Sequence, residues 1–198
     1  MRYATFTDPT KSNRQSKMKR SIIFLIIMFS FFSTTNADYD KVATNFKFKG
    51  IDGDIIDMNE YKNKVVVVVN VASRCGFTNQ YEGLQKLWTN YQREGLIIIG
   101  VPSDNFRQEP GSNKEIKDFC ETTFGISFPI TEKNNVIGKN SHPFFLWAKD
   151  SYGIGAIPKW NFHKIIIGKN GKVVNTFSSI TKPYSNKFLE VIKTELKN

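Results

Sequence analysis

The sequence has few of the residue types that build metal centres or disulfide frameworks. Its 198 residues include two cysteines, Cys75 and Cys120, and two histidines, and no cysteine lies at zinc-ligand spacing from another cysteine or a histidine. A small secreted scaffold held together by disulfides would contain more cysteine. This scarcity disfavours a structural zinc site. The two thiols are therefore inert buried residues, one structural bridge, or a redox pair.

Long basic runs are also missing, although the chain carries a net charge of +10. Residues 1–37 hold six lysines and arginines against Asp8 alone, so five of the ten surplus charges lie there. The other 161 residues are mildly basic, contain no run of five basic residues and match no nucleic-acid motif. This distribution predicts a solvated basic surface and no nucleic-acid partner.

The apolar run over residues 22–32 is too short for a membrane span. It covers eleven residues, whereas a membrane-spanning helix needs about 20. It follows a basic segment and precedes small residues that suit cleavage after Ala37, which is the pattern of a secretory signal. We therefore expect a targeting leader over residues 1–37 and a folded domain over residues 38–198, with no stable membrane span in the mature domain.

Other interpretations of this leader stay open. It is also compatible with an uncleaved N-terminal anchor, or with delivery to an organelle that is reached through the secretory route. Translation from Met18 or Met28 would shorten or skip the leader, which would allow a cytosolic or mitochondrial form.

The first strong pattern in the domain is a run of five valines that begins at Val65 and leads to Cys75. An unbroken apolar run of β-branched residues indicates a strand that is buried on both faces, as in α/β sheets. Sites in such sheets lie beyond the carboxyl ends of the strands, where Cys75 falls. A helix that starts just after it would favour the thiolate over the thiol.

The remaining patterns alternate between strands and helices. An Asp-Gly turn and an Asn-Gly turn each predict a hairpin, and Ser112 with Glu115 forms a capping box that predicts a helix start. The expected hairpins cover residues 46–57 and residues 160–177, a second buried strand covers 96–101, and helices cover 80–93, 112–123, 142–148 and 183–197. This order predicts an α/β protein with a thioredoxin-like fold, in which a central mixed sheet is flanked by helices.

A dithiol oxidoreductase of the ordinary thioredoxin type is disfavoured within this fold. Such enzymes carry Cys-x-x-Cys, but here Cys75 is followed by Gly76, Phe77 and Thr78.

Three segments resemble the sequence motifs of the glutathione peroxidase family. They occur in the family's order, and the similarity spans about residues 40–196. The segments are Asn70-Val-Ala-Ser-Arg-Cys-Gly-Phe-Thr78, Gln108-Glu-Pro-Gly-Ser-Asn113 and Trp160-Asn-Phe-His-Lys164. Each motif alone is modest support for membership, whereas three in the right order are highly specific.

The resemblance implies a catalytic tetrad. Cys75 takes the position of the reacting thiol, and Gln108, Trp160 and Asn161 take the other three positions. Cys120 matches the resolving cysteine of the members that use thioredoxin, so the resemblance favours thioredoxin over glutathione as the electron donor. No bound cofactor and no metal are expected.

The sequence departs from the family pattern in two loops. The loop before Gln108 is one residue shorter than usual, and Ser103 stands where a cysteine is frequent. The long insertion of tetrameric members before the third motif is missing, because only residues 148–159 separate the preceding helix from that motif. The resemblance therefore implies a monomer.

Reduction of a hydroperoxide needs a thiolate nucleophile and donors for the departing oxygen. The side chains of Gln108, Trp160 and Asn161 are neutral donors, and we expect them to be aimed at the sulfur. The resulting sulfenic acid would condense with Cys120, which requires a local opening of its helix if the thiols rest apart. His163, two residues after Asn161, is expected to point outward from a strand. The alternatives are a glutathione-dependent peroxidase and a redox sensor or binding module with little turnover.

Overall fold

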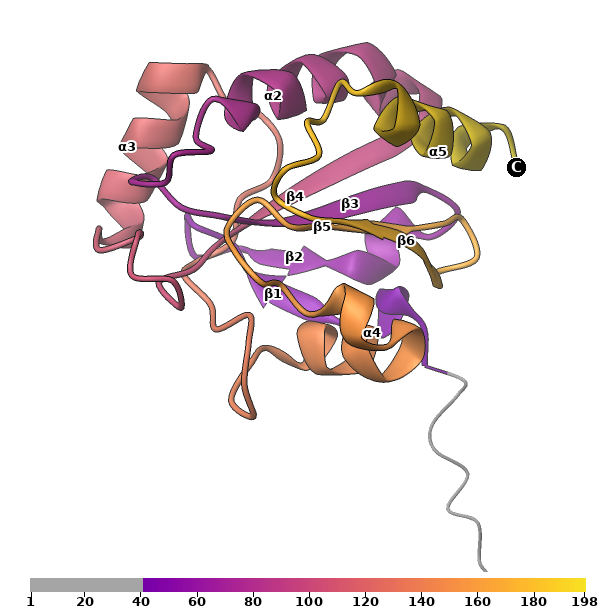
Figure 1. The fold of residues 1–198 in the computed structure, drawn as a ribbon, viewed down its shortest axis with the longest axis horizontal. Helices are drawn as coiled ribbons and strands as arrows, with labels where there is room; N and C mark the ends of the chain where they lie inside the picture. The colour runs from indigo at the N-terminus through magenta and orange to yellow at the C-terminus, as the bar shows by residue number, and fades with distance from the viewer. Residues whose placement is uncertain (1–40) are drawn as a thin grey trace, which may run out of the picture. The chain divides into compact units, whose positions relative to one another are not determined.

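The structure is a computed structural model that describes residues 41–198. The predicted leader and the expected start of the domain at Asp38 lie outside the described residues. Four strands form the central sheet in the order β4-β3-β5-β6 (Figure 1). They are β3 (Val65–Val71), β4 (Leu96–Pro102), β5 (Lys164–Ile167) and β6 (Val173–Phe177). β3 pairs parallel with β4 and antiparallel with β5, and β6 pairs antiparallel with β5, so the sheet is mixed as predicted.

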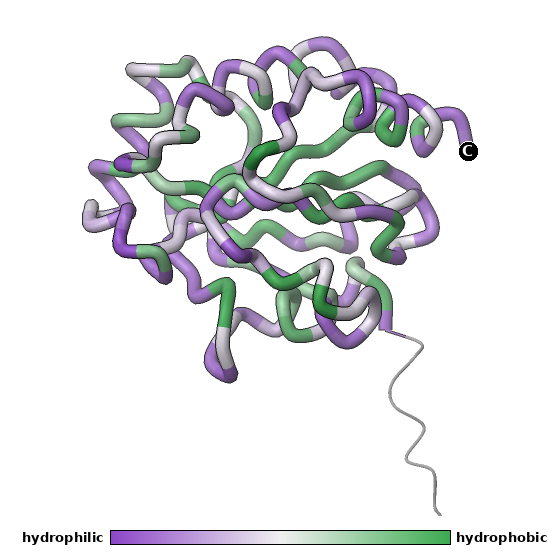
Figure 2. Tube along the Cα trace, viewed as in Figure 1, coloured by the Kyte–Doolittle hydropathy of each residue, from purple (hydrophilic) through white to green (hydrophobic). Residues whose placement is uncertain are grey.

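The valine strand β3 lies at the centre of the sheet and feeds two hydrophobic cores. Val65, Val67, Val69 and Val71 belong to one core, while Val66 and Val68 belong to the other. Side chains of a strand alternate between the faces of a sheet, so an unbroken valine run fits a strand that is covered on both sides. Figure 2 shows the hydrophobic residues running through the sheet between more hydrophilic helices.

Helices cover both faces of the sheet. Figure 1 shows α2 and α5 on one face, with α3 beside α2, and α4 on the other face. Their bounds are α2 (Gln80–Tyr91), α3 (Asn113–Phe124), α4 (Pro143–Tyr152) and α5 (Asn186–Lys197). A separate hairpin of β1 (Lys47–Lys49) and β2 (Ile55–Asp57) accompanies α4, and four short 3-10 helices are η1 (Ala43–Asn45), η2 (Met58–Tyr61), η3 (Gln92–Glu94) and η4 (Ile154–Ala156). The sheet with helices on both faces confirms the predicted α/β class.

The turn and cap signals of the sequence act as expected. The Ser112 side chain accepts a hydrogen bond from the Glu115 N–H, and the Glu115 carboxylate accepts one from the Ser112 N–H, which closes the capping box of α3. The turn between β5 and β6 uses Gly171 at φ 76°, a conformation that glycine adopts without steric cost. These local contacts define the start of α3 and the turn of the β5–β6 hairpin.

Two expectations about the third motif are wrong. β5 begins at Lys164, so residues 160–163 form a loop ahead of the strand rather than part of it. His163 is only 6 % exposed and does not point into solvent. The reason is a tight bend at Phe162, whose φ of 64° breaks the extended backbone just before the strand.

No helix within residues 41–198 is long and apolar enough to cross a membrane.

Candidate active site

Cys75 lies in a tight loop between the carboxyl end of β3 and the start of α2. Its carbonyl oxygen accepts two hydrogen bonds from Thr78, one from the backbone N–H at 3.1 Å and one from the hydroxyl at 2.9 Å. The Phe77 N–H donates to the Cys75 sulfur at 3.4 Å. The side chain is almost fully buried. The loop therefore fixes the sulfur beside backbone N–H groups that precede a helix, a setting in which a negative charge is stabilised.

The segment that contains Gln108 is fastened to the Cys75 loop. The Arg74 N–H donates to the Gln108 carbonyl oxygen at 3.0 Å. Ser73 donates twice to one carboxylate oxygen of Glu109, from its N–H at 2.8 Å and from its hydroxyl at 3.0 Å. Burial raises the pKa of Glu109, while the two bonds from Ser73 act in the opposite direction. These bonds hold the backbone of Gln108 and Glu109 against the two residues that precede Cys75.

The segment that contains Trp160 and Asn161 is held by Asn70, the penultimate residue of β3. The Asn70 side chain donates to the Trp160 carbonyl at 3.2 Å and accepts from the His163 N–H at 3.1 Å. The Asn70 carbonyl accepts from the Phe162 N–H at 2.6 Å. A single buried asparagine thus forms hydrogen bonds with three backbone groups of a loop that lies about ninety residues away in the sequence.

Two of the predicted tetrad residues are in direct contact. The Asn161 side-chain amide donates to the Gln108 side-chain oxygen at 2.9 Å, and Asn161 is fully buried. The other end of the Asn161 side chain, Oδ1, meets no hydrogen-bond partner. The Trp160 ring remains 41 % exposed and lies 5.4 Å from the ring of Phe106. The structure therefore brings Gln108 and Asn161 into contact and ties their segments to residues that flank Cys75, whereas their action on the sulfur stays a prediction.

Cys120 lies on α3, on the side that faces the same core as Cys75. Both thiols are free and buried, and both belong to the core cluster formed with α2 and β3. Burial raises the pKa of Cys120 to about 11, and the Tyr81 hydroxyl acts in the opposite direction. The Cys120 thiol is therefore protonated at neutral pH in this resting arrangement.

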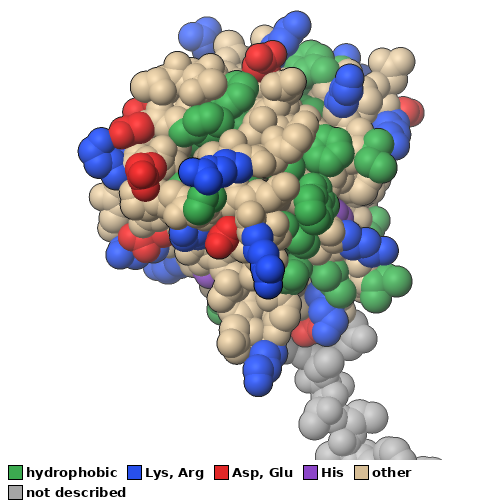
Figure 3. All heavy atoms as spheres, turned by 60° about the vertical axis from the view of Figure 1, so that its left-hand side comes forward, with side chains coloured by type: hydrophobic (Ala, Val, Ile, Leu, Met, Phe, Trp, Pro, Cys, Tyr) green, Lys and Arg blue, Asp and Glu red, His purple; other side chains and the backbone are tan. Residues whose placement is uncertain are grey.

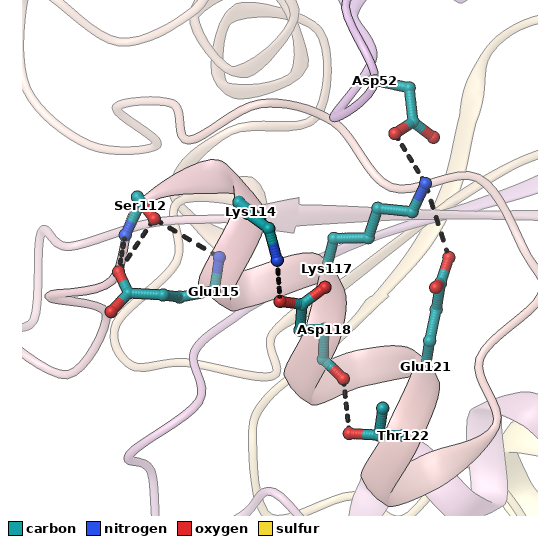
Figure 4. A network of polar contacts seen from close by, with 8 residues as sticks. All are labelled: Asp52, Ser112, Lys114, Glu115, Lys117, Asp118, Glu121 and Thr122. Atoms are coloured by element: carbon teal, nitrogen blue, oxygen red, sulfur yellow. Dashed lines mark hydrogen bonds and ion pairs between the residues drawn. The ribbon is translucent and has the colours of Figure 1, made fainter.

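Polar contacts hold the outer face of α3. Lys117 bonds to Asp52 of the β1–β2 turn at 2.6 Å and approaches Glu121 at 3.7 Å, and Lys114 pairs with Asp118 (Figure 4). These side chains are largely exposed, and such pairs contribute little stability. Only Ile116 and Cys120 of the helix are fully buried. α3 is thus attached to the core by a narrow strip that includes the second thiol.

Sequence reasoning missed a buried polar group under the Cys75 loop. Lys164 donates to the Gln80 side-chain oxygen and to the Thr181 carbonyl at 2.7 Å, and it has no exposed surface. Burial lowers its pKa to about 7. Burial likewise lowers the pKa of His163 to about 4, so that its ring is neutral at pH 7. The only signal in the sequence is the position of both residues at the end of the third motif, and no pattern reveals that a lysine there is buried.

The sequence of this chain is similar to that of known peroxidases. The family model described as glutathione peroxidase matches residues 43–149. The glutathione peroxidase homologue BsaA of Bacillus subtilis is 44 % identical over 144 residues, which is 70 % of this chain and 89 % of that protein. The glutathione peroxidase-like peroxiredoxin 2 of Saccharomyces cerevisiae is 43 % identical over 151 residues, covering 74 % of this chain and 86 % of that protein.

A further relative is similar in sequence, and two solved structures are similar in fold. The hydroperoxy fatty acid reductase gpx1 of Synechocystis is 42 % identical and covers 74 % of this chain and 92 % of that protein. A crystal structure of T. cruzi GPX1 superposes with a TM-score of 0.63 at 26 % identity, over 80 % of this chain and 98 % of that one. A thioredoxin-family protein of Chlorobium tepidum, at 17 % identity, has a TM-score of 0.58 over 76 % of this chain and 92 % of its own, and it shows the fold alone. The chain belongs to the glutathione peroxidase family and is a peroxidase with a thioredoxin-like fold.

Proposed function

We propose that this thiol peroxidase reduces hydroperoxides at Cys75 and returns to its reduced state through a Cys75–Cys120 disulfide that thioredoxin opens. The observation that carries the proposal is the placement of the two thiols. Cys75 sits where loops that carry Gln108 and Asn161 converge, and Cys120 lies in the same core on the loosely attached helix α3.

In the first step the Cys75 thiolate attacks one oxygen of the hydroperoxide. The S–O bond forms, the O–O bond breaks with both electrons leaving on the second oxygen, and that oxygen takes a proton to become water or an alcohol. Sulfur is oxidised to a sulfenic acid while the peroxide is reduced. The Phe77 N–H stabilises the sulfur anion. The Gln108 and Asn161 amides and the Trp160 indole are the side chains proposed to stabilise the charge on the departing oxygen.

In the second step Cys120 attacks the sulfenic acid, and the disulfide forms as water leaves. A disulfide requires α-carbons within about 7 Å, so we expect the helix around Cys120 to open locally while the Cys75 loop stays in place. The narrow attachment of α3 supports this view, because few buried contacts must be broken.

The choice of reductant follows from where the cycle ends. An intramolecular disulfide is the natural substrate of a dithiol such as thioredoxin, which exchanges through a mixed disulfide. Glutathione would instead react with the Cys75 sulfenic acid directly and would have no need of Cys120. The name of the yeast relative, a glutathione peroxidase-like peroxiredoxin, is compatible with the two-cysteine route.

The surface supports organic hydroperoxides as substrates alongside hydrogen peroxide. Trp160, at the edge of the site, is 41 % exposed, and Ile154 and Ile180 are among the most exposed large hydrophobic residues of the described chain. Figure 3 shows one face on which hydrophobic side chains gather beside lysine and arginine. An apolar surface with a basic border suits an amphipathic hydroperoxide, and a relative is named as a hydroperoxy fatty acid reductase. Such an activity would serve an antioxidant response to oxidative stress.

The test is a coupled assay that follows NADPH oxidation in the presence of thioredoxin and thioredoxin reductase. Hydrogen peroxide and a fatty acid hydroperoxide serve as substrates, and a parallel assay replaces thioredoxin with glutathione and its reductase. Cys75→Ser is expected to lose activity in both assays. Cys120→Ser is expected to lose thioredoxin-supported turnover while still consuming one equivalent of peroxide. Full thioredoxin-supported activity of Cys120→Ser would overturn the resolving role.

A further inference from the structure

The phenol of Tyr81 is a large buried polar side chain that the mechanism above leaves unexplained. Tyr81 is the second residue of α2 and has no exposed surface. Its hydroxyl has no hydrogen-bond partner of ordinary geometry, whereas buried hydroxyl groups nearly always have one. A buried polar group without a partner calls for an explanation, and a role in proton transfer is one such explanation.

Tyr81 is tied to the Cys75 loop by its backbone. The Tyr81 N–H donates to the Thr78 carbonyl at 2.9 Å, and Thr78 donates from both its N–H and its hydroxyl to the Cys75 carbonyl. Any opening of α3 leaves these bonds intact, because none of them involves α3. Tyr81 therefore stays with Cys75 throughout the proposed cycle.

The Tyr81 ring also reaches the helix that carries Cys120. It packs against Phe124 of α3 and against Phe162 of the third motif, with ring centroids 5.2 Å apart in both pairs. Residues four apart share one face of a helix, so Phe124 lies on the same face of α3 as Cys120. Tyr81, Cys75 and Cys120 are members of one core cluster. The titratable groups that act on the phenol are Cys120, Glu109 and Cys75, and among these Cys120 acts most strongly.

We propose that the Tyr81 hydroxyl relays the proton that Cys120 gives up when it resolves the Cys75 sulfenic acid. This inference rests on the proposed Cys75–Cys120 disulfide. The sulfur–sulfur bond forms as the S–O bond of the sulfenic acid breaks, and both electrons of that bond leave with the oxygen. The phenol gives its proton to the departing hydroxide, which becomes water, and receives the thiol proton of Cys120. Cys120 is oxidised, the sulfenic sulfur is reduced, and Tyr81 ends unchanged.

Chemical reasons favour a relay at this point of the cycle. The Cys120 thiol holds its proton in the buried resting site, so resolution must remove that proton as the new bond forms. Hydroxide is a poor leaving group unless it is protonated as it departs. A phenol hydroxyl both donates and accepts, and it can therefore serve both needs in one motion.

Tyr81→Phe tests the proposal because it removes the hydroxyl and keeps the ring contacts with Phe124 and Phe162. The two steps are measured separately after one equivalent of hydrogen peroxide, without thioredoxin. Oxidation of Cys75 is followed by peroxide consumption, and the sulfenic acid is trapped with dimedone and counted by mass spectrometry. The control is Tyr91→Phe, which removes the hydroxyl of a half-buried tyrosine at the far end of the same helix.

The expected result is a split between the two steps. In Tyr81→Phe the oxidation rate stays at the wild-type value, while the sulfenic acid persists at least about tenfold longer than in the wild type. The slowing of wild-type resolution in deuterated water is also expected to shrink in Tyr81→Phe. Tyr91→Phe is expected to match the wild type in both steps.

Three outcomes would count against parts of the scheme. An unchanged sulfenic acid lifetime in Tyr81→Phe would overturn the relay, as would an equal slowing of both steps, because a loosened core affects both. A sulfenic acid in Cys120→Ser that disappears as fast as in the wild type would instead overturn the resolving role of Cys120. The thermal unfolding midpoint of each variant identifies any general loss of stability.

Discussion

The two thiols share one hydrophobic core, but the segments that carry them are held in opposite ways. The Cys75 loop is bound on two sides by hydrogen bonds to the segments of Gln108 and Trp160, through Ser73, Arg74 and Asn70. Asn70 is buried and Ser73 and Gln108 are half-buried, whereas Arg74 and Trp160 reach the surface. The loop therefore has one well-defined arrangement, as a site that must aim donors at a developing charge requires.

The segment that carries Cys120 has the opposite character. α3 fully buries only Ile116 and Cys120, while Phe119 and Phe124 are half-buried against the same core, and its remaining contacts are a capping box and ion pairs near the solvent. Elements with few buried contacts open locally at low cost in free energy. The comparison shows that the segment at which the peroxide reacts is rigid, whereas the helix whose thiol must move toward Cys75 is weakly attached.

The largest expected effect comes from breaking the rigid side at Asn161. Asn161→Ala removes one amide of the pair, and the remaining Gln108 amide loses the donor that fixes its orientation. We expect kcat/KM for hydrogen peroxide to fall by about a hundredfold or more, by analogy with the loss of one oxyanion-hole donor. The cost in the free energy of unfolding should stay near about 1 kcal/mol, since the lost bond is offset by removing the unpartnered buried Oδ1.

Steady-state kinetics with thioredoxin, together with chemical unfolding, measure both quantities. The matched control is Asn175→Ala on the edge strand β6, where the asparagine oxygen accepts only from the Thr176 N–H at 2.8 Å. A variant Asn161→Ala that keeps more than about a third of the wild-type kcat/KM would show that the amide pair does not assist the reaction.

Much of this arrangement follows from local sequence patterns. The valine run, the Asn-Gly turn and the Ser112 capping box each act within a few residues, and the structure has each element where the pattern predicts it. The three motifs likewise identify the segments that meet at Cys75. Predictions succeed here because period, turn chemistry and capping are short-range properties.

The wrong expectations concern contacts between distant segments. His163 was expected on a strand, but its backbone N–H is bonded to the Asn70 side chain, 93 residues away in the sequence. The burial of Lys164 against Gln80 and Thr181 is a contact of the same kind, for which the sequence analysis made no prediction. Neither contact is visible in the local pattern, because the pairing of β3 with β5 brings Asn70 to His163, and the partners of Lys164 lie 84 and 17 residues away in the sequence.

An effect of intermediate size is expected at α3, where weakening the helix should speed the disappearance of the sulfenic acid. Ser112→Ala removes the capping hydrogen bond of α3, which costs about 1 kcal/mol of helix stability. If opening of α3 limits formation of the disulfide, that difference corresponds to about a fivefold faster disappearance of the sulfenic acid. Dimedone trapping after one equivalent of peroxide measures this rate.

The control for the loose side is Ser185→Ala. Ser185 occupies the same cap position at α5, but its side chain makes no capping bond there. Resolution that is slower in Ser112→Ala than in the control would contradict the view that α3 must open. An unchanged rate would mean that another step limits resolution, and the weak attachment of α3 would then have no role in the cycle.

The last expected effect leaves the reaction rates aside and concerns the pH dependence of the stability of the rigid side. Burial lowers the pKa of Lys164 to about 7, from 10.5 in an exposed lysine. Between these values the unfolded chain binds more protons than the folded one, so stability increases as pH rises through this window and is lost as pH falls to about 7. Lys164→Met removes the titrating group, and we expect the rise with pH to be reduced relative to the wild type, by at most about 1.4 kcal/mol per pH unit. Thermal unfolding at several pH values within the window measures this difference.

The control Lys169→Met removes a lysine that donates to the Leu196 carbonyl at 2.7 Å from a partly exposed position. A rise with pH that is equal in Lys164→Met and the wild type would mean that the buried amine does not titrate there. The stability of the rigid side would then rest on hydrogen bonds that do not change with pH in this range.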